Sequence, residues 1–304
     1  MTMANVTKRL FTDETGQGIL TQLTAQNAYL AALHGDRANL ATTDKTSLVA
    51  AINEIVSFSI ALKEGTGAGL HNSLYRGKYL GDHLTAEQWA AIASGTFEGL
   101  WLGDYWIING VTWRVADFDY FLHSGDTECT THHVAIVPDQ TLYNARMNPT
   151  NTTDGAYVGS EMYTTNLAQA KTIINNAFGA EHILNHRVYL HNAVSNGYPS
   201  AGAWCDSTVE LMTEQMVYGG KVFAPTSDGS TVPMLHTVCK SQLALFRLCP
   251  EKIIATALAS GARMWYWLRD VVCASGFANV HHGGTAYWDN ASTVGGVRPA
   301  FLIH

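Results

Sequence analysis

Two glycines near the C-terminus, Gly283 and Gly284, constrain the fold of this chain more than any other local feature. They lie between two stretches of strand-like composition, Phe277 to His281 and Thr285 to Trp288. Glycine accepts positive φ, so a Gly-Gly pair between two such stretches favours a hairpin turn. The sequence therefore predicts a β-hairpin close to the end of the chain.

Apolar segments that each carry one arginine flank the expected hairpin. An aromatic-rich stretch containing Arg269 precedes it, and a stretch containing Arg298 and Pro299 follows it. A guanidinium in apolar surroundings usually stacks on rings or pairs with a carboxylate, which holds loops together. We therefore interpret both arginines as structural. The aromatic residues expected in the core are Trp265, Trp267 and Phe301.

The composition between these two segments is typical of a recognition surface. At interfaces Tyr and Trp supply contact area, and small polar side chains supply adaptable hydrogen bonds. We predict that exposed side chains of this region bind a ligand, although His281 and His282 also suit solvated turn positions. The predicted ligand-binding residues are Tyr266, Asp270, Asn279, His281, His282, Thr285, Tyr287, Trp288, Asp289, Asn290, Thr293 and Val294.

The closing segment resembles the end of the C-type-lectin-like domains of phage and bacterial variable proteins. The resemblance rests on an aromatic-Trp-Leu-Arg segment, a short polar hairpin and the closing Gly-Val-Arg-Pro-Ala-Phe at 296–301. The upstream stretch 103–117, which opens with Gly-Asp-Tyr-Trp, is similar to the opening strands of that domain. The likeness therefore covers roughly residues 76–304.

This family includes the ligand-binding proteins diversified by diversity-generating retroelements, and its fold is distantly similar to that of formylglycine-generating enzymes. The resemblance implies an α+β, C-type-lectin-like domain with high loop content, in which varied C-terminal side chains contact the ligand. It also implies a phage tail-fibre or tail-tip receptor-binding protein, located in the virion and assembled in the host cytoplasm. The implied ligand is a host cell-surface protein or glycan.

The N-terminal part has helical periodicity. Apolar residues recur at helical spacing from Ile19 to Leu33 and again from Leu48 to Ile55, with Thr43 or Asp44 as the expected cap of the second helix. The stretch Thr42 to Ile55 also resembles a short motif that recurs in phage tail-fibre and related virion proteins.

Two helices of this length have too little surface for a core of their own, so they must pack on something else. We expect self-association into a homotrimer that joins the protein to other phage tail proteins; the alternative is packing on the globular domain of the same chain. A glycine-rich joint follows the helices. The expected domains are an N-terminal helical attachment and trimerisation segment at 1–64, a linker at 65–75 and the ligand-binding domain at 76–304.

Local signals predict further elements between the linker and the C-terminal segment. Thr85 and Gln88 form a capping box, and Asn109-Gly110 is a hairpin signal. The other expected elements are strands at 74–80 and 132–137, a helix at 166–178 ended by Gly179, and a helix capped by Asp206 that stops near Gly219.

Charge and hydropathy exclude two classes of partner. Charged residues make up 14% of the chain and the net charge is −7, so no basic stripe is present that would neutralise phosphates. We therefore expect no nucleic-acid partner. The sequence contains no uninterrupted apolar run near 20 residues, and we expect no membrane insertion.

Catalytic and metal-binding motifs have little support in the sequence. Metal-ligand residue types crowd together at 123–133, but His132 and His133 would point to opposite faces of a strand, which favours a structural loop. The five cysteines include no C-x-x-C pair, which favours buried free thiols. We expect a binding protein without enzymatic activity, cofactor or metal. The alternatives are a virion-associated surface-glycan hydrolase and a structural virion protein without a ligand.

Overall fold

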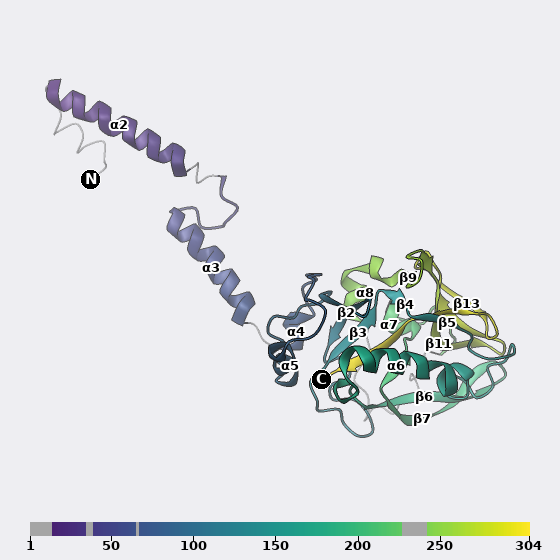
Figure 1. The fold of residues 1–304 in the computed structure, drawn as a ribbon. Helices are drawn as coiled ribbons and strands as arrows, with labels where there is room; N and C mark the ends of the chain where they lie inside the picture. Colours follow the sequence, from purple (N-terminus) through teal and green to yellow (C-terminus); the bar gives the residue numbers. More distant parts are fainter. Residues whose placement is uncertain (1–13, 35–38, 65–66, 227–241) are drawn as a thin grey trace. The chain divides into compact units, whose positions relative to one another are not determined.

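The computed structural model describes residues 14–34, 39–64, 67–226 and 242–304 (Figure 1). The chain divides into two compact units, residues 1–65 and residues 66–304. The second unit already includes a short helix, α4 (Ala68–His71), whose His71 side chain is buried. Part of the expected linker 65–75 is therefore packed into the second unit.

The described residues of the first unit form two helices, α2 (Glu14–His34) and α3 (Leu48–Glu64), as predicted. The predicted cap of α3 is wrong, because the hydroxyl of Ser47 accepts a hydrogen bond from the Ala50 N–H at 3.0 Å. The backbone N–H groups of Thr43 and Asp44 instead donate to the carboxylate of Glu54, at 2.8 and 2.7 Å. This contact fixes the loop ahead of α3 against the helix.

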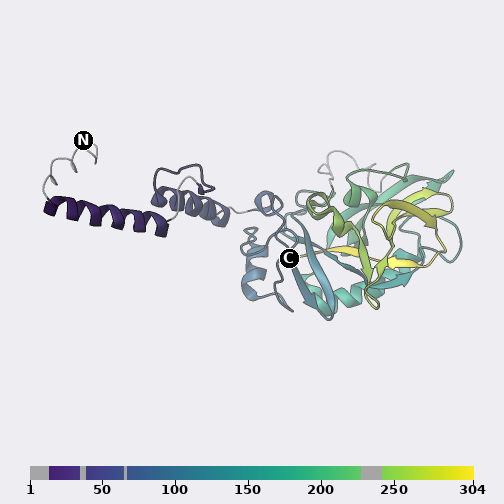
Figure 2. The ribbon, with the colours of Figure 1, turned by 90° about the horizontal axis from the view of Figure 1, so that it is seen from above.

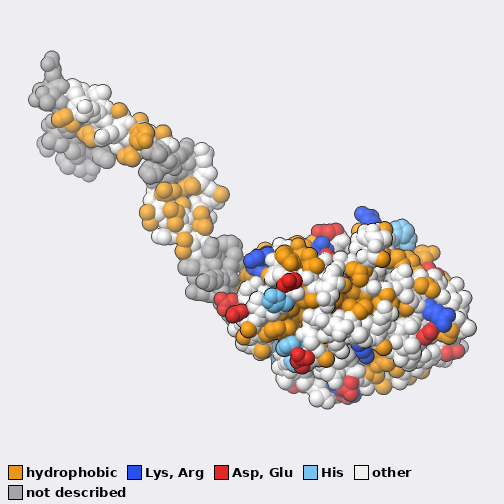
Figure 3. Space-filling view, in the orientation of Figure 1, with side chains coloured by type: hydrophobic (Ala, Val, Ile, Leu, Met, Phe, Trp, Pro, Cys, Tyr) orange, Lys and Arg blue, Asp and Glu red, His pale blue; other side chains and the backbone are white. Residues whose placement is uncertain are grey.

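Both helices expose large apolar side chains. In Figure 3 orange side chains lie along the surface of both helices. These side chains recur at helical spacing and are 43% to 67% exposed. They are Ile19, Leu23, Tyr29 and Leu30 in α2, and Val49, Ile52, Ile55 and Val56 in α3.

The second unit is an α+β unit built on two five-stranded sheets. In Figures 1 and 2 the yellow and green C-terminal strands lie beside teal strands from the middle of the chain. The first sheet has the order β1-β2-β3-β15-β8, and its strands are β1 (Tyr105–Ile108), β2 (Val111–Phe118), β3 (Val134–Pro138), β8 (Val209–Leu211) and β15 (Pro299–Ile303).

The second sheet carries the C-terminal hairpin. It has the order β13-β12-β11-β14-β5, and its strands are β5 (Tyr143–Ala145), β11 (Tyr266–Cys273), β12 (Gly276–Val280), β13 (Ala286–Asn290) and β14 (Gly295–Val297). A three-stranded sheet contains β4 (Gln140–Thr141), β9 (Ala255–Ala257) and β10 (Arg263–Met264), and a separate hairpin contains β6 (His186–Ser195) and β7 (Tyr198–Ser207).

Several local predictions for this unit are confirmed. Thr85 and Gln88 form the capping box of α5 (Ala86–Ala93), and α6 (Leu167–Phe178) ends at Gly179 with a φ of 84°. The β1–β2 hairpin turns at Asn109 and Gly110, which both have positive φ. A β3 strand also forms close to its expected position at 132–137.

Two local predictions are wrong. Asp206 lies in β7 and caps no helix; the next helix, α7 (Glu214–Tyr218), is capped by the Thr213 hydroxyl, which accepts from the Met216 N–H at 3.0 Å. Chain pairing with β6 therefore overrides the capping tendency of Asp206. Residues 74–80 form only isolated bridges, from Tyr75 and Tyr79 to neighbouring segments, and no complete strand.

Aromatic packing joins α6 to the first sheet. The rings of Trp113, Phe178 and Phe301 pack edge to face, with centroids 5.3 to 5.5 Å apart. Such pairs stabilise a core beyond the area that they bury. Phe301 and Trp267 are buried, as predicted, whereas Trp265 is only half-buried. Another short helix, α8 (Ala244–Leu248), packs against β2 and α7.

Arg298 links the C-terminal segment to the rest of the unit. Its side chain is completely buried, and its guanidinium donates to the carbonyl oxygens of Pro138, Lys252 and Ile253 at 2.7 to 2.9 Å. Arg269 is also buried and lies over the Tyr157 ring, 5.9 Å from its centroid. The structural interpretation of both arginines is confirmed.

Candidate functional site

The predicted C-terminal hairpin is present at the edge of the second sheet. Strands β12 and β13 pair in antiparallel register, and β13 is the outermost strand. The His281 N–H donates to the Thr285 carbonyl and the Gly284 N–H donates to the His281 carbonyl, both at 2.8 Å. Of the two glycines only Gly284 has positive φ, at 88°. The turn thus depends on one glycine and not on the pair.

Strand register decides which side chains share a face of the hairpin. Asn279 lies opposite Tyr287 and Phe277 lies opposite Asp289, whereas Trp288 pairs with Ala278. Directly opposed residues point to the same face, and neighbours along a strand point to opposite faces. Tyr287 and Asp289 therefore face one side, and Trp288 faces the other.

The face that carries Tyr287 is hollowed into an open groove of about 630 Å³, here called the hairpin groove. Its volume is within the range of ligand sites in proteins. Six predicted ligand-binding residues and one unpredicted residue meet there. The lining residues are Trp265, Asn279, His281, His282, Thr285, Tyr287 and Asp289.

The groove combines aromatic rings with a few polar groups. Tyr287 is 51% exposed, and the rings of His281 and His282 lie 3.7 Å apart between centroids. The buried amide of Asn279 lies at the floor, and Asp289 is the one carboxylate among these lining residues. Aromatic walls with few convergent polar groups suit the binding of another molecule.

Three predicted residues lack the exposure that was expected of them. Tyr266, Asp270 and Asn279 are 0%, 1% and 2% exposed. Both Tyr266 and Asp270 lie in β11, an inner strand of the second sheet, and their side chains contact other segments of the unit. Only Asn279 still reaches the groove.

The two buried residues of β11 have structural partners. The Tyr266 hydroxyl donates to the Ile253 carbonyl at 2.9 Å and accepts from the Arg298 guanidinium at 3.1 Å. Burial raises the pKa of the Tyr266 hydroxyl. Asp270 accepts a hydrogen bond from the Glu214 N–H at 2.6 Å. Both side chains therefore hold the scaffold beneath the groove and do not face the solvent.

The remaining predicted residues lie outside the groove. The half-buried Trp288 ring covers Gly276 on the opposite face, where an added Cβ would lie 2.6 Å from the ring. Asn290 and Val294 are exposed. Thr293 is half-buried and donates its hydroxyl hydrogen to Asp289 at 3.1 Å.

Sequence reasoning missed Trp265 as a groove residue. Its ring lies against Gly295, where an added Cβ would come within 2.2 Å of the ring. Only glycine leaves room for an indole that close to the backbone. The Gly-Gly pair at 295–296 therefore indicates that a large side chain packs over this part of the backbone, and the sequence alone shows this pair.

Sequence reasoning also missed Val222 and Phe223, which follow α7. They are 55% and 41% exposed, and the Phe223 ring lies 6.1 Å from the Tyr287 ring between centroids. No periodicity or motif marks this stretch, because its position depends on contacts with residues far away in the sequence.

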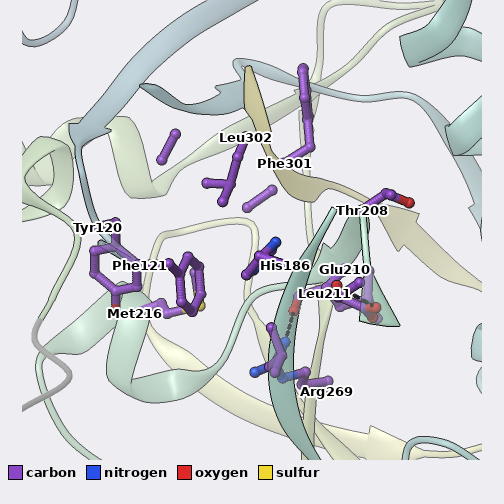
Figure 4. Close-up of a pocket in the computed structure, with 14 residues that line it drawn as sticks. Tyr120, Phe121, His186, Thr208, Glu210, Leu211, Met216, Arg269, Phe301 and Leu302 are labelled. Carbon is purple, nitrogen blue, oxygen red and sulfur yellow. Dashed lines mark hydrogen bonds between the residues drawn. The ribbon is translucent and has the colours of Figure 1, made fainter. Parts of the chain in front are cut away.

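A second cavity lies in the core and is too small for a ligand. Figure 4 shows it between His186, Glu210, Arg269 and the aromatic rings of Tyr120 and Phe121. Its volume is about 20 Å³, enough for about one water molecule. Glu210 accepts from the hydroxyls of Tyr157 and Ser207 at 2.7 and 2.8 Å, and burial raises the pKa of its carboxyl.

The histidine-rich stretch 123–133 has separate partners for each histidine. His123 contacts Glu128 at 2.6 Å, His132 contacts Asp119 at 2.8 Å, and the ring of His133 accepts from the Phe121 N–H at 3.0 Å. Within the described ranges, no three potential metal ligands come together. These contacts hold the stretch as a loop ahead of β3.

Four of the five cysteines are described; none of these four forms a disulfide, but only two of them are buried as predicted. Cys129 and Cys249 are buried, whereas Cys205 and Cys273 are half-buried. Cys239 lies outside the described residues. Among the helices that the structure describes, none is long and apolar enough to cross a membrane.

One family, described as a domain of unknown function (DUF6273), matches residues 209–304 of the chain. The matched part begins at β8 and contains the hairpin groove, Val222 and Phe223. No curated protein and no solved structure matches the chain.

Proposed function

We propose that the second unit is a C-type-lectin-like ligand-binding domain and that the chain is a phage tail-fibre or tail-tip receptor-binding protein. The observation that carries the proposal is the hairpin groove, which presents Tyr287 and the two histidines at an open edge of the second sheet. The ligand is a molecule on the host cell surface.

The division between scaffold and surface supports a binding role. Arg298, Tyr266 and Asp270 are buried and hydrogen-bonded beneath the groove, whereas Tyr287 and Thr285 are exposed. Folding energy comes from the buried groups, so the exposed positions are free to change. The same division suits diversification by a retroelement. A reverse transcriptase gene and a near-copy of the final coding segment in the neighbouring DNA would be its signature.

The first unit supplies the proposed attachment to the tail. Its exposed apolar residues, such as Ile52 and Ile55, need a partner surface. Homotrimerisation through these helices would cover them, join the chain to other phage tail proteins and multiply weak contacts at each groove into useful avidity. The proposed location is therefore the virion.

The chemistry of the groove favours binding over glycan hydrolysis. Glycosidases use two carboxyl groups that flank the scissile bond. The residues lining the groove provide one carboxylate, Asp289, and its Oδ1 accepts from the Thr293 hydroxyl.

The test is binding of the fluorescently labelled full-length chain to a panel of whole bacterial strains. The triple variant with His282→Ala, Thr285→Ala and Tyr287→Ser should lose binding or bind a different set of strains. Because these side chains are exposed, the melting temperature should shift by no more than about 2 °C.

The matched control exchanges Tyr198, an equally exposed tyrosine in β7, for Ser. This variant should bind the same strains as the unsubstituted chain. Binding that survives the groove exchange unchanged would count against the proposed function.

A further inference from the structure

The segment after α7 is held by one buried carboxylate. Glu214, the first residue of α7, is completely buried. Its two carboxylate oxygens accept hydrogen bonds from the backbone N–H groups of Val222, Phe223 and Ala224, at 2.7, 2.9 and 3.0 Å. Hydrogen bonds between an ionised acceptor and N–H donors are stronger than neutral ones. The main chain at 222–224 is therefore fixed.

Glu214 is itself positioned by the scaffold beneath the groove. Its backbone N–H donates to the buried carboxylate of Asp270 in β11 at 2.6 Å. At the other end of α7, the Tyr218 hydroxyl donates to the carbonyl of Gly284 in the hairpin turn at 3.2 Å. Helix α7 thus connects the segment 222–224 to both β11 and the hairpin.

These hydrogen bonds fix the backbone and leave the side chains outside. Val222 and Phe223 are 55% and 41% exposed although their N–H groups are bonded to a buried residue. The Phe223 ring packs edge to face with Tyr287 of the groove, at an angle of 68°. Two exposed rings from separate segments therefore lie in contact, and the exposed Val222 precedes one of them in the chain.

We propose that Val222 and Phe223 form a second arm of the ligand-binding surface and that the ligand is a protein. This inference rests on the proposed function. The centres of protein–protein interfaces are rich in aromatic residues and poor in charged ones, with polar groups at the rim. The Phe223 and Tyr287 rings, with the exposed Val222 next to Phe223 in the chain, form such a centre, and Thr285, Asp289 and the two histidines line the groove beside Tyr287. The exposed side chains of Val222 and Phe223 match an apolar patch on a partner and offer a sugar hydroxyl no hydrogen bond.

Asp270 and Glu214 are positioning residues in this arrangement. Asp270 holds the N-terminus of α7, and Glu214 holds the segment that carries Phe223. Neither carboxylate reaches the solvent, so neither contacts the ligand itself.

The test compares three variants of the full-length chain on a strain that binds the unsubstituted protein. Phe223→Ala should raise the half-saturating concentration about tenfold or more, since truncation of an aromatic interface centre has this effect. Tyr287→Ala should do the same, and Tyr198→Ala should bind normally. If Tyr287→Ala loses binding and Phe223→Ala does not, the second arm is wrong and the proposed function stands. If neither substitution alters binding, the proposed function itself fails.

Treatment of the cells identifies the class of ligand. Digestion of surface proteins with proteinase K should remove binding of the unsubstituted chain. Binding that survives the protease and disappears after periodate oxidation of sugars overturns the assignment of a protein ligand.

Hydrogen exchange tests the positioning role without any ligand. In Glu214→Gln an amide group replaces one acceptor oxygen, so the N–H groups of residues 222–224 should exchange at least about tenfold faster. Glu98→Gln, at an exposed glutamate, is the matched control and should leave their exchange unchanged. Unchanged exchange in Glu214→Gln overturns the role of Glu214, and the Phe223→Ala result still tests the second arm.

Discussion

Asp117 shows at the scale of one residue how burial sets a protonation state. The Asp117 carboxyl in β2 is buried, and burial raises its pKa to about 6, although it accepts hydrogen bonds from the Asn72 amide and the Ala244 N–H, both at 2.8 Å. In the unfolded chain the same carboxyl titrates near 3.8. The folded state therefore binds this proton more tightly than the unfolded state does.

The contribution of Asp117 to stability should fall as pH rises. It is fully present below about pH 4 and is lost above about pH 6, a change on the order of 3 kcal/mol in the free energy of unfolding. Urea denaturation at a series of pH values should show this decrease for the native chain relative to Asp117→Asn. In the control Asp154→Asn, at an exposed position, the decrease should persist. Parallel pH profiles for the native chain and Asp117→Asn would contradict the assignment.

Arg298 shows how one side chain can hold several segments. Lysine keeps the charge but lacks the planar fork that donates to Pro138, Lys252 and Ile253 together. Arg298→Lys should therefore lower the free energy of unfolding by about 3 kcal/mol. The urea midpoint measures this loss, and Arg263→Lys, at an exposed arginine, should leave the midpoint unchanged. Equal midpoints for the two variants would contradict the role of Arg298.

At the scale of elements, the two adjacent glycines of the hairpin turn have different roles. An added Cβ at Gly284 would force a side chain into positive φ and come within 3.0 Å of Ile254. At Gly283 the nearest atom is 3.7 Å away, which is ordinary contact. The turn thus requires glycine at one of the two positions.

Gly284→Ala should lower the free energy of unfolding by about 1 to 2 kcal/mol, since a left-handed backbone disfavours a Cβ by this amount. Gly283→Ala should be close to neutral. Thermal unfolding of both variants measures the difference. A larger loss in Gly283→Ala would show that the turn has another geometry in solution.

Elements whose signals are local could be predicted from the sequence, and elements that depend on distant contacts could not. The Thr85 capping box, the Asn109-Gly110 turn and the C-terminal hairpin each depend on a few adjacent residues, and each is present. Asp206 failed as a cap because it pairs with β6 across a hairpin that turns at Asn196-Gly197, a local signal that the prediction overlooked.

The candidate site was predictable in part for the same reason. The hairpin places Tyr287 and Asp289 on one face by simple alternation, and both line the groove. Asp270 was misplaced because its carboxylate contacts the N-terminus of α7, which is far away in the sequence. Phe223 was missed because it is held by Glu214, whose own N–H contacts a residue 56 positions away.

At the scale of the whole molecule, we expect the first unit to mediate assembly and the second unit to bind the ligand. The full-length chain should have about three times the monomer mass of 33.0 kDa, because self-association covers the exposed apolar residues of α2 and α3. Residues 66–304 alone should be monomeric and keep their melting temperature. Light scattering coupled to size exclusion measures both masses. A monomeric full-length chain would contradict the proposed homotrimer.

The outer position of β13 limits how the groove can evolve. Because successive residues of a strand point to opposite sides, gain or loss of one codon within 286–290 would turn Tyr287 and Asp289 away from the groove and bring Trp288 into it. Substitutions of single residues leave this orientation intact. Because β13 is hydrogen-bonded to a neighbouring strand on one side only, such substitutions disturb the hydrogen bonds of one strand pair. New binding specificity at this surface should therefore evolve by amino-acid substitution and not by insertion or deletion.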